Sequence, residues 1–213
     1  MSQLQQLRKE YSKASLDEQS VIKDPFKQFE KWLNEALTTE LPEPNAMCLA
    51  TVSTDGRPSQ RIVLLKGIEQ QGFVFYTNYQ SKKGNQLAQN PFCSLTFFWH
   101  ELERQVRIEG ICEKIAEEQS VAYFQSRPIG SQLGAWVSPQ SSPISNREIL
   151  EQRFASIQER FKGLTKLPKP QQWGGYLVKP HLIEFWQGRE SRLHDRLEFN
   201  KTDDGWKLIR LAP

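Results

Sequence analysis

Short apolar segments separated by tight turns constrain the fold of this chain more than any other feature. Residues 46–53, 60–68 and 73–77 are largely apolar, and the turns Thr54-Asp55-Gly56 and Gln70-Gln71-Gly72 separate them. Strands joined by turns this short pair antiparallel, so we expect these three segments to form a meander. The folded part of the chain therefore contains an antiparallel sheet.

The remaining segments extend this sheet and add helices to it. Further strands are expected at residues 93–99, 104–115, 175–178, 183–186, 192–199 and 206–211, and helices at residues 25–38, 81–89, 117–125 and 146–161. Strands and helices do not alternate regularly, and no G-x-G-x-x-G motif is present, which argues against a doubly wound parallel sheet. The pattern predicts an α+β chain built on a closed or nearly closed antiparallel β-barrel with peripheral helices.

The composition fits one globular domain with a short extension. Among 213 residues there are 12 Phe and 6 Trp, enough aromatic residues for a β-rich core. Residues 1–22 are polar and we expect them to form a mobile N-terminal arm, whereas residues 23–213 form a single domain.

Charge and cysteine usage exclude several classes of function. A net charge of +3 without a basic stripe argues against a nucleic-acid partner, and no apolar run reaches the length of a membrane span. The start of the chain does not resemble a secretory signal. Cys48, Cys93 and Cys112 are odd in number and widely spaced, so we expect reduced cysteines in a cytoplasmic protein and no metal site built on cysteine and histidine.

The segment Arg192-Leu193-His194-Asp195-Arg196 concentrates charge on one expected strand. Side chains at alternate positions share a face, so Arg192, His194 and Arg196 would form one cationic surface. Like charges held close together repel, and a phosphorylated ligand would relieve that repulsion. For this segment alone, the alternative is a solvated strand with a ladder of charges.

Further clusters along the chain also indicate anion binding. These are Arg61 and Lys66 at the ends of an apolar strand, Lys82 and Lys83 at an expected helix start, and Tyr123, Arg127 and Ser131 around Pro128. Taken singly, lysines at a helix start are usually solvated, and a tyrosine stacked on an arginine is common. Together the clusters predict two anion sites, and Gln105, Gln140 and Ser141 supply groups able to hydrogen-bond a heterocycle.

The order of these motifs resembles the pyridoxine (pyridoxamine) 5′-phosphate oxidase family over essentially the whole chain. The segments that carry the resemblance are Arg8-Lys9-Glu10-Tyr11, Phe75-Tyr76-Thr77-Asn78, Ser81-Lys82-Lys83, Glu103-Arg104-Gln105, Ser126-Arg127-Pro128, Gln140-Ser141-Ser142 and residues 60–66, 134–138, 185–188, 192–197 and 210–213. The resemblance implies an antiparallel split β-barrel that binds FMN, and a homodimer with two active sites at the subunit interface. It also implies oxidation of pyridoxamine and pyridoxine 5′-phosphate to pyridoxal 5′-phosphate, with O₂ as final acceptor and H₂O₂ as product.

The resemblance also implies roles for individual residues. Cofactor contacts would fall on Arg61, Ile62, Val63, Leu64, Leu65, Lys66, Tyr76, Thr77, Lys82, Lys83, Gln105, Gln140, Ser141, Trp186 and Arg196. Substrate contacts would fall on Lys66, Tyr123, Arg127 and Ser131 at the phosphate, on Arg192, Leu193 and His194, and on an arm that closes over the substrate through Arg8, Lys9, Glu10 and Tyr11. Arg192 and His194 would be the catalytic residues, and no metal is implied.

Two positions depart from the family pattern, and two other classes of protein stay open. Lys82 stands where relatives often have arginine, so a bidentate phosphate contact becomes a point charge. Ser191 stands where relatives have histidine or asparagine. The alternatives are a split-barrel flavin reductase and a non-catalytic protein that binds flavin or pyridoxal phosphate. Neither would require the substrate set and the flavin set together, and this chain has both.

Overall fold

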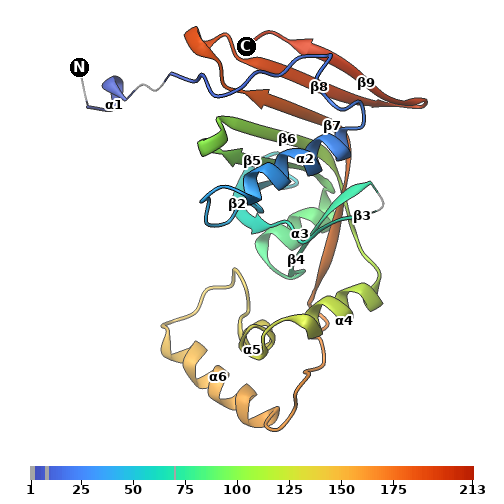
Figure 1. Cartoon of the computed structure of the whole chain (residues 1–213). Helices are drawn as coiled ribbons and strands as arrows, with labels where there is room; N and C mark the ends of the chain where they lie inside the picture. The colour runs from blue at the N-terminus through green and yellow to red at the C-terminus, as the bar shows by residue number, and fades with distance from the viewer. Residues whose placement is uncertain (1–2, 8–9, 70) are drawn as a thin grey trace.

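The computed structural model describes residues 3–7, 10–69 and 71–213, and Figure 1 shows their arrangement. Among these residues, one antiparallel sheet contains nine strands. The strands are β1 (Ala46–Val52), β2 (Pro58–Leu64), β3 (Gly67–Glu69), β4 (Gly72–Asn78), β5 (Phe92–Trp99), β6 (Arg104–Lys114), β7 (Trp173–Gln187), β8 (Asp195–Thr202) and β9 (Gly205–Leu211). The helices are α1 (Gln3–Gln6), α2 (Pro25–Leu37), α3 (Lys82–Gln89), α4 (Glu117–Ser126), α5 (Ile129–Val137) and α6 (Glu148–Arg160), with 3₁₀ turns η1 (His100–Leu102) and η2 (Glu190–Arg192).

The sheet curls into a partly open barrel. Its strand order is β2-β1-β5-β6-β7-β4-β3, with β8 and β9 added beside β7. Only Leu65 and Lys66 separate the first strand of this order from the last, so the two edges must lie close together. The Leu65 N–H donates to the Asn45 carbonyl (2.9 Å) and the Lys66 N–H donates to the Val74 carbonyl (2.8 Å), which ties both edges to this crossing. The predicted α+β class with an antiparallel barrel is confirmed.

The predicted meander is wrong, although each of its strands exists. β2 pairs with β1, whereas β4 pairs with β3 and β7. The segment expected as one strand over residues 60–68 divides at Leu65 and Lys66, because there the chain leaves one edge of the barrel and joins the other. Local turn signals report a short connection but not which strands become neighbours.

The segments expected as two strands at residues 175–178 and 183–186 form one strand, β7. Pro180 and His181, which fall between the two expected segments, lie inside it. The register between β6 and β7 shifts between Glu109 and Gly110, opposite Pro180. Proline is tolerated in a strand at such a bulge because no ladder hydrogen bond is lost.

Helix α2 starts and ends as its sequence predicts. The Asp24 side chain accepts hydrogen bonds from the backbone of Phe26 and Lys27, and Pro25 occupies the first turn. The expected helices around residues 81–89, 117–125 and 146–161 correspond to α3, α4 and α6. Helix α5 was not expected, because its two glycines, Gly130 and Gly134, weaken the helical pattern.

Two apolar cores give the molecule two ends. The main core fills the barrel beneath α2 and includes fully buried Phe29, Phe75 and Phe185. A second core lies under α4 and α5 around Phe124 and Trp173. Figure 1 shows β7 running from the α4–α5 end of the molecule to the end that carries β8, β9 and the N-terminal segment.

Part of the N-terminal segment is docked on the barrel. Leu16 and Val21 are each 4% exposed and join the main core. The segment around Leu16 and Val21 is therefore docked on the barrel. The expectation of a mobile arm stays a prediction for the residues that precede this segment.

Candidate active site

A cavity of about 630 Å³ lies between strands β2 and β4 and helices α4 and α5. The residues lining it that were expected to bind cofactor or substrate are Ile62, Val63, Leu64, Lys66, Tyr76, Thr77, Lys83, Gln140, Tyr123, Arg127 and Ser131. Segments far apart in the sequence therefore converge here, as the family resemblance implies. We call this space the α5 cavity.

A buried lysine forms one cationic end of the α5 cavity. The Lys83 side chain is 8% exposed, and its Nζ donates to Gln140 Oε1 (2.9 Å) and Thr77 Oγ1 (3.0 Å). Burial, together with the charge of Arg61, lowers the pKa of Lys83 to about 8. Among the described residues, no acidic side chain forms an ion pair with Lys83. A buried cation held only by neutral oxygens is a preformed site for an anion.

Arg61 supports the same end of the cavity from strand β2. Its Nη1 donates to Thr51 Oγ1 (2.7 Å) and the Leu49 carbonyl (3.1 Å), and its Nη2 donates to Ser59 Oγ (2.9 Å). All of these acceptors are neutral, and burial lowers the pKa of Arg61. The positive field of Arg61 and Lys83 together is therefore not cancelled locally.

Arg127 forms a second cationic point in the α5 cavity. Its Nη1 is buried and has no hydrogen-bond partner among the described residues, while the guanidinium lies 4.7 Å from the Trp173 ring centroid. Burial lowers the pKa of Arg127. Tyr123 and Ser131 line the same wall, so a phenol, a hydroxyl and an unsatisfied guanidinium face one volume. This arrangement suits a phosphate monoester.

Tyrosine rings form the wall between these two points. Tyr76 and Tyr123 stack with ring centroids 3.9 Å apart, and Trp173 stacks with Tyr76 at 5.3 Å and with Tyr123 at 6.2 Å. Burial raises the pKa of Tyr76 to about 12, so its hydroxyl stays protonated at neutral pH. A flat aromatic wall of this kind accommodates a planar ring.

Three other residues that were expected to bind the cofactor do not line the α5 cavity. Leu65 is 5% exposed and packs in the main core, so its side chain faces away from the cavity. Lys82 and Ser141 are exposed. Ser141 has a left-handed backbone (φ 70°) beside Gln140, whose side chain receives the Lys83 hydrogen bond.

Gln105, Trp186 and Arg196 lie at the opposite end of the molecule. They are in register across strands β6, β7 and β8, with Gln105 paired to Trp186 and Trp186 paired to Arg196. The Arg196 Nε donates to Glu184 Oε1 (2.7 Å), and Glu184 is 2% exposed. These residues therefore form one row on the sheet.

The expectation that Arg192 and His194 share a strand face is wrong. Strand β8 begins at Asp195, Arg192 lies in the 3₁₀ turn η2, and both Ser191 (φ 56°) and Arg192 (φ 61°) have left-handed backbones. His194 instead packs against Trp186, with ring centroids 4.6 Å apart. The charge pattern therefore identified residues that lie together near Trp186, but the argument from strand alternation does not apply to them.

A second cavity of about 720 Å³ lies beside Arg192 and His194, and we call it the arm cavity. We call these two residues the His194 cluster. Glu10, Tyr11, Arg192 and His194 line the arm cavity. Leu193, another expected substrate contact, is 70% exposed beside it. Arg8 and Lys9 were also expected to contact substrate and lie outside the described residues.

Backbone contacts define the state of the His194 ring. Its Nδ1 accepts a hydrogen bond from the Arg189 N–H (3.1 Å), so the neutral imidazole carries its proton on Nε2. Partial burial and the nearby Arg192 charge lower the pKa of His194. A neutral ring with Nε2–H outward acts as a hydrogen-bond donor.

Strand β7 separates the two cavities. Trp173 at its start lines the α5 cavity, and Trp186 near its end contacts His194 beside the arm cavity. At about 3.3 Å per residue, the strand path between these two tryptophans is roughly 40 Å. The residues expected to bind the substrate phosphate therefore lie at one end of the folded molecule, and the residues expected to be catalytic lie at the other end.

The matching family models cover most of the chain. The model described as "Pyridoxamine 5′-phosphate oxidase" matches residues 33–161, and "Pyridoxine 5′-phosphate oxidase C-terminal dimerisation region" matches residues 173–213. The chain belongs to the pyridoxamine 5′-phosphate oxidase family. This confirms the family resemblance and the oxidase class expected from the sequence.

Individual relatives agree over the full length. The chain is 56% identical to a pyridoxine/pyridoxamine 5′-phosphate oxidase of Acaryochloris marina, covering 97% of this chain and 94% of that protein. It is 55% identical to one of Burkholderia multivorans, covering 100% of both. Among solved structures, PhzG from Burkholderia lata in complex with tetrahydrophenazine-1-carboxylic acid is 30% identical, with a TM-score of 0.86 over 92% of this chain and 95% of that one.

A more distant structure shows the same fold. An FMN-binding protein related to pyridoxamine 5′-phosphate oxidase from Nostoc punctiforme is 19% identical, with a TM-score of 0.70 over 94% of this chain and all of that one. The predicted split-barrel fold is thereby confirmed. In the described part of the chain, no helix has the length and apolar character needed to cross a membrane.

Some residues of the two cavities were not predicted. Trp173 supports Arg127 and ends the tyrosine stack, and Thr51 and Ser59 hold Arg61. Trp173 stands before two glycines, Gly174 and Gly175, where added Cβ atoms would clash with the side chains of Tyr79 and Ile115. The available sequence signal was the pair of glycines beside the tryptophan, because adjacent glycines indicate that the backbone approaches its neighbours closely.

Proposed function

We propose that this chain oxidises pyridoxamine 5′-phosphate and pyridoxine 5′-phosphate to pyridoxal 5′-phosphate, with FMN as cofactor. O₂ is the final electron acceptor and H₂O₂ the second product. FMN, when bound, supplies the redox chemistry by accepting a hydride from the substrate. The chain therefore needs residues that bind and orient, and no metal of its own.

The observation that carries this proposal is the pair of cationic points in the α5 cavity that have no acidic partner among the described residues. FMN and a phosphorylated vitamin B6 molecule each end in a phosphate monoester. Lys83 and Arg61 offer one buried positive site without an acidic partner in the described chain, and Arg127 offers another through its unpaired Nη1. A cofactor with a single phosphate fits the first site better than FAD, since buried cations at the end of a cavity leave no path for an adenosine tail.

The residues around these points fit the two molecules. Lys83, Arg61 and Lys82 would hold the FMN phosphate, with Lys66 between the cofactor and the substrate. Tyr123, Arg127 and Ser131 would hold the substrate phosphate. A non-catalytic flavin carrier would not need these three residues, and all three line the α5 cavity.

We propose that the active unit is a homodimer whose two sites each use both chains. Arg192 and His194 are separated from Arg127 by the length of β7, and a vitamin B6 phosphate is far shorter than this path. A second copy would bring its His194 cluster, with Gln105, Trp186 and Arg196, to the α5 cavity of the first. The match of residues 173–213 to a dimerisation region supports this arrangement.

An exposed apolar surface also supports the dimer. Ile62, Phe92, Phe98 and Ile111 are 65%, 57%, 57% and 45% exposed. Strand pairing places them on one outer face, because Phe92 pairs with Ile111, and Cys48 pairs with both Thr96 and Ile62. Ile62 also lines the α5 cavity, so a copy docked on this face would reach the site.

The three unpaired cysteines are consistent with a cytoplasmic location.

Within this arrangement, residues of this chain divide the work. Arg127 and its neighbours bind the phosphate equally before and during the reaction. Arg192 and His194 would orient the pyridine ring, His194 through its Nε2–H, so that the reacting carbon faces the flavin. Closure by the second chain would exclude water from the site.

The test is the visible spectrum of the purified protein. We expect a yellow protein whose flavin absorbance bleaches when pyridoxamine 5′-phosphate is added without oxygen and returns when air is admitted. The same experiment with tetrahydrophenazine-1-carboxylic acid, the molecule bound to PhzG, tests a different substrate class. Bleaching by that acid alone would reject the proposed substrate, and failure to retain FMN would reject the proposed cofactor.

A further inference from the structure

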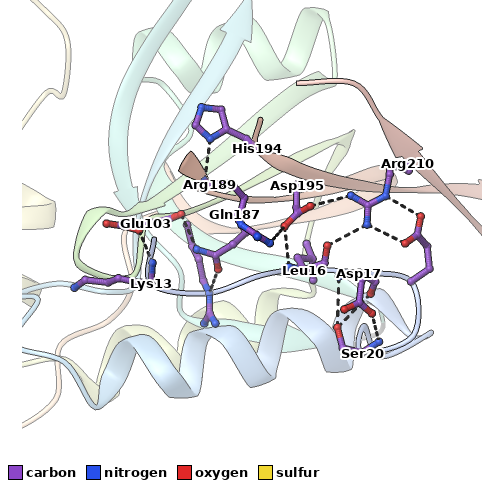
Figure 2. A network of polar contacts seen from close by, with 12 residues as sticks. Lys13, Leu16, Asp17, Ser20, Glu103, Gln187, Arg189, His194, Asp195 and Arg210 are labelled. Carbon is purple, nitrogen blue, oxygen red and sulfur yellow. Dashed lines mark hydrogen bonds and ion pairs between the residues drawn. The ribbon is translucent and has the colours of Figure 1, made fainter. Parts of the chain in front are cut away.

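Residues 10–18 are held along the end of the sheet that carries the His194 cluster (Figure 2). The backbone N–H groups of Ser12 and Lys13 both donate to Glu103 Oε2, at 2.9 and 3.0 Å. The Leu16 N–H donates to Asp195 Oδ2 at 3.1 Å. Three peptide groups of the N-terminal segment are thus bound by two carboxylates from distant parts of the chain.

The same two residues also hold the ends of the loop that carries Arg192 and His194. The Glu103 carbonyl accepts a hydrogen bond from the Gly188 N–H (2.7 Å), immediately before this loop. Asp195 follows the loop, and its carboxylate accepts from the Arg189 guanidinium (2.9 Å). Glu103 and Asp195 therefore connect residues 10–18 to both ends of the 189–194 loop.

Arg210 extends this connection from strand β9. Its Nη1 donates to Asp195 Oδ1 (2.9 Å), and its Nε and Nη2 donate to the two carboxylate oxygens of Glu18 (both 2.8 Å). Its Nη2 also donates to the Leu16 carbonyl (3.1 Å). Asp195 is therefore fixed from both sides, by the loop and by the docked segment.

The 189–194 loop needs such external support. Ser191 and Arg192 both adopt left-handed backbone conformations, and each costs free energy that surrounding contacts must offset. Tyr11 packs over the start of the loop so closely that a Cβ added to Gly188 would lie 2.7 Å from the Tyr11 Cβ. The Tyr11 ring lies 5.8 Å from Trp186 and 5.9 Å from His194, centroid to centroid.

We propose that Glu103 and Asp195 are positioning residues for the reaction. They clamp residues 10–18 across the 189–194 loop, and the clamp holds Arg192 and His194 in the orientation that the reaction uses. This inference rests on the proposed function for the roles of Arg192 and His194. The hydrogen bond from the Arg189 N–H to His194 Nδ1 lies inside the loop, so it reports directly whether the loop keeps its shape.

The experiment is hydrogen exchange on the full-length protein, resolved to single amides by NMR, together with steady-state oxidation of pyridoxamine 5′-phosphate. The variants are Glu103→Gln and Asp195→Asn, which keep side-chain size and remove one charge. Asp17→Asn is the matched control, because Asp17 caps only its own turn through Gln19 and Ser20.

We expect the Ser12, Lys13 and Arg189 amides to exchange about tenfold faster in Glu103→Gln, the loss expected for a hydrogen bond to a charged group. In Asp195→Asn the Leu16 and Arg189 amides should do so. Each variant should lose about tenfold in kcat and keep its flavin content, whereas Asp17→Asn should match the wild type in all of these measurements.

The proposal is overturned if the amides of residues 12–16 exchange faster while Arg189 exchange and kcat stay at wild-type values. In that case the docked segment is only a cover. Unchanged exchange throughout would also overturn it. If the wild-type protein oxidised no vitamin B6 phosphate, the proposed function would fail, yet the Arg189 amide would still report whether the clamp holds the loop.

Discussion

Replacing Lys83 by methionine should abolish FMN binding and leave the stability of the flavin-free protein nearly unchanged at neutral pH. Lys83 is 8% exposed, donates hydrogen bonds only to neutral oxygens of Thr77, Gln140 and Ser81, and has its pKa lowered from 10.5 to about 8. A folded-state pKa that far below the unfolded value costs roughly 3 kcal/mol of stability at neutral pH. Methionine removes this cost but loses these three hydrogen bonds, worth about 1 kcal/mol each, so the two effects nearly cancel.

The pH dependence of the stability difference has a definite sign. Between about pH 8 and 10.5 the unfolded chain holds more protons at Lys83 than the folded chain does, so wild-type stability rises with pH in that window. The cost is fully present below about pH 8 and disappears as pH approaches 10.5. Lys83→Met should therefore become less stable than the wild type over the same window, by about 3 kcal/mol at its upper end, where only the lost hydrogen bonds remain.

The assay is urea unfolding of the flavin-free proteins at several pH values, with FMN affinity measured by quenching of flavin fluorescence. Lys82→Met is the matched control, because Lys82 is the adjacent and exposed lysine, and its stability should stay within about 0.5 kcal/mol of the wild type. A Lys83→Met protein whose stability difference from the wild type does not change between pH 7 and pH 10 would refute the reasoning.

Three further outcomes test the rest of the account. Arg127→Ala should raise KM for pyridoxamine 5′-phosphate more than it lowers kcat, whereas Arg192→Ala should lower kcat about 100-fold through lost alignment, both read from initial rates; equal kcat in Arg192→Ala and wild type would remove Arg192 from the site. Phe98→Glu should yield monomers in sedimentation velocity and expose Cys48, which lies on the same face, to thiol reagents; a dimer with unchanged thiol protection would disprove that interface. FAD should bind far more weakly than FMN in the fluorescence titration, and equal affinities would contradict the closed phosphate site.

The sequence predicted most elements of the fold because their signals are local. The Asp24-Pro25 start of α2 and the turn before β9 depend on neighbouring residues only. The pairing of β4 with β7, nearly one hundred residues later, depends on closure of the barrel and leaves no local signal. The break predicted around Pro180 was wrong for the same reason, because the bulge that accommodates this proline depends on the register of the partner strand.

The candidate site was predicted as a set of residue types but not as an arrangement. Clusters of charged and aromatic residues in the sequence pointed to Lys83, Arg127 and His194. That His194 lies at the far end of β7 from Arg127 could not be read from either motif, because the distance depends on the length of an unbroken strand. The clamp through Glu103 and Asp195 was missed because single carboxylates in loops resemble solvated surface residues.

Subunit complementation tests most directly the claim that each active site is built from two chains. Arg127→Ala and Arg192→Ala chains are co-expressed with different tags, and mixed dimers are purified through both tags. In a mixed dimer one site carries both changes and the other carries neither. At substrate concentrations well below the raised KM of Arg127→Ala both parents turn over slowly, so the account predicts that the mixed dimer there has about half of the wild-type activity. Mixed dimers that are no more active than the parents would show that each site lies within one chain, and would contradict the account.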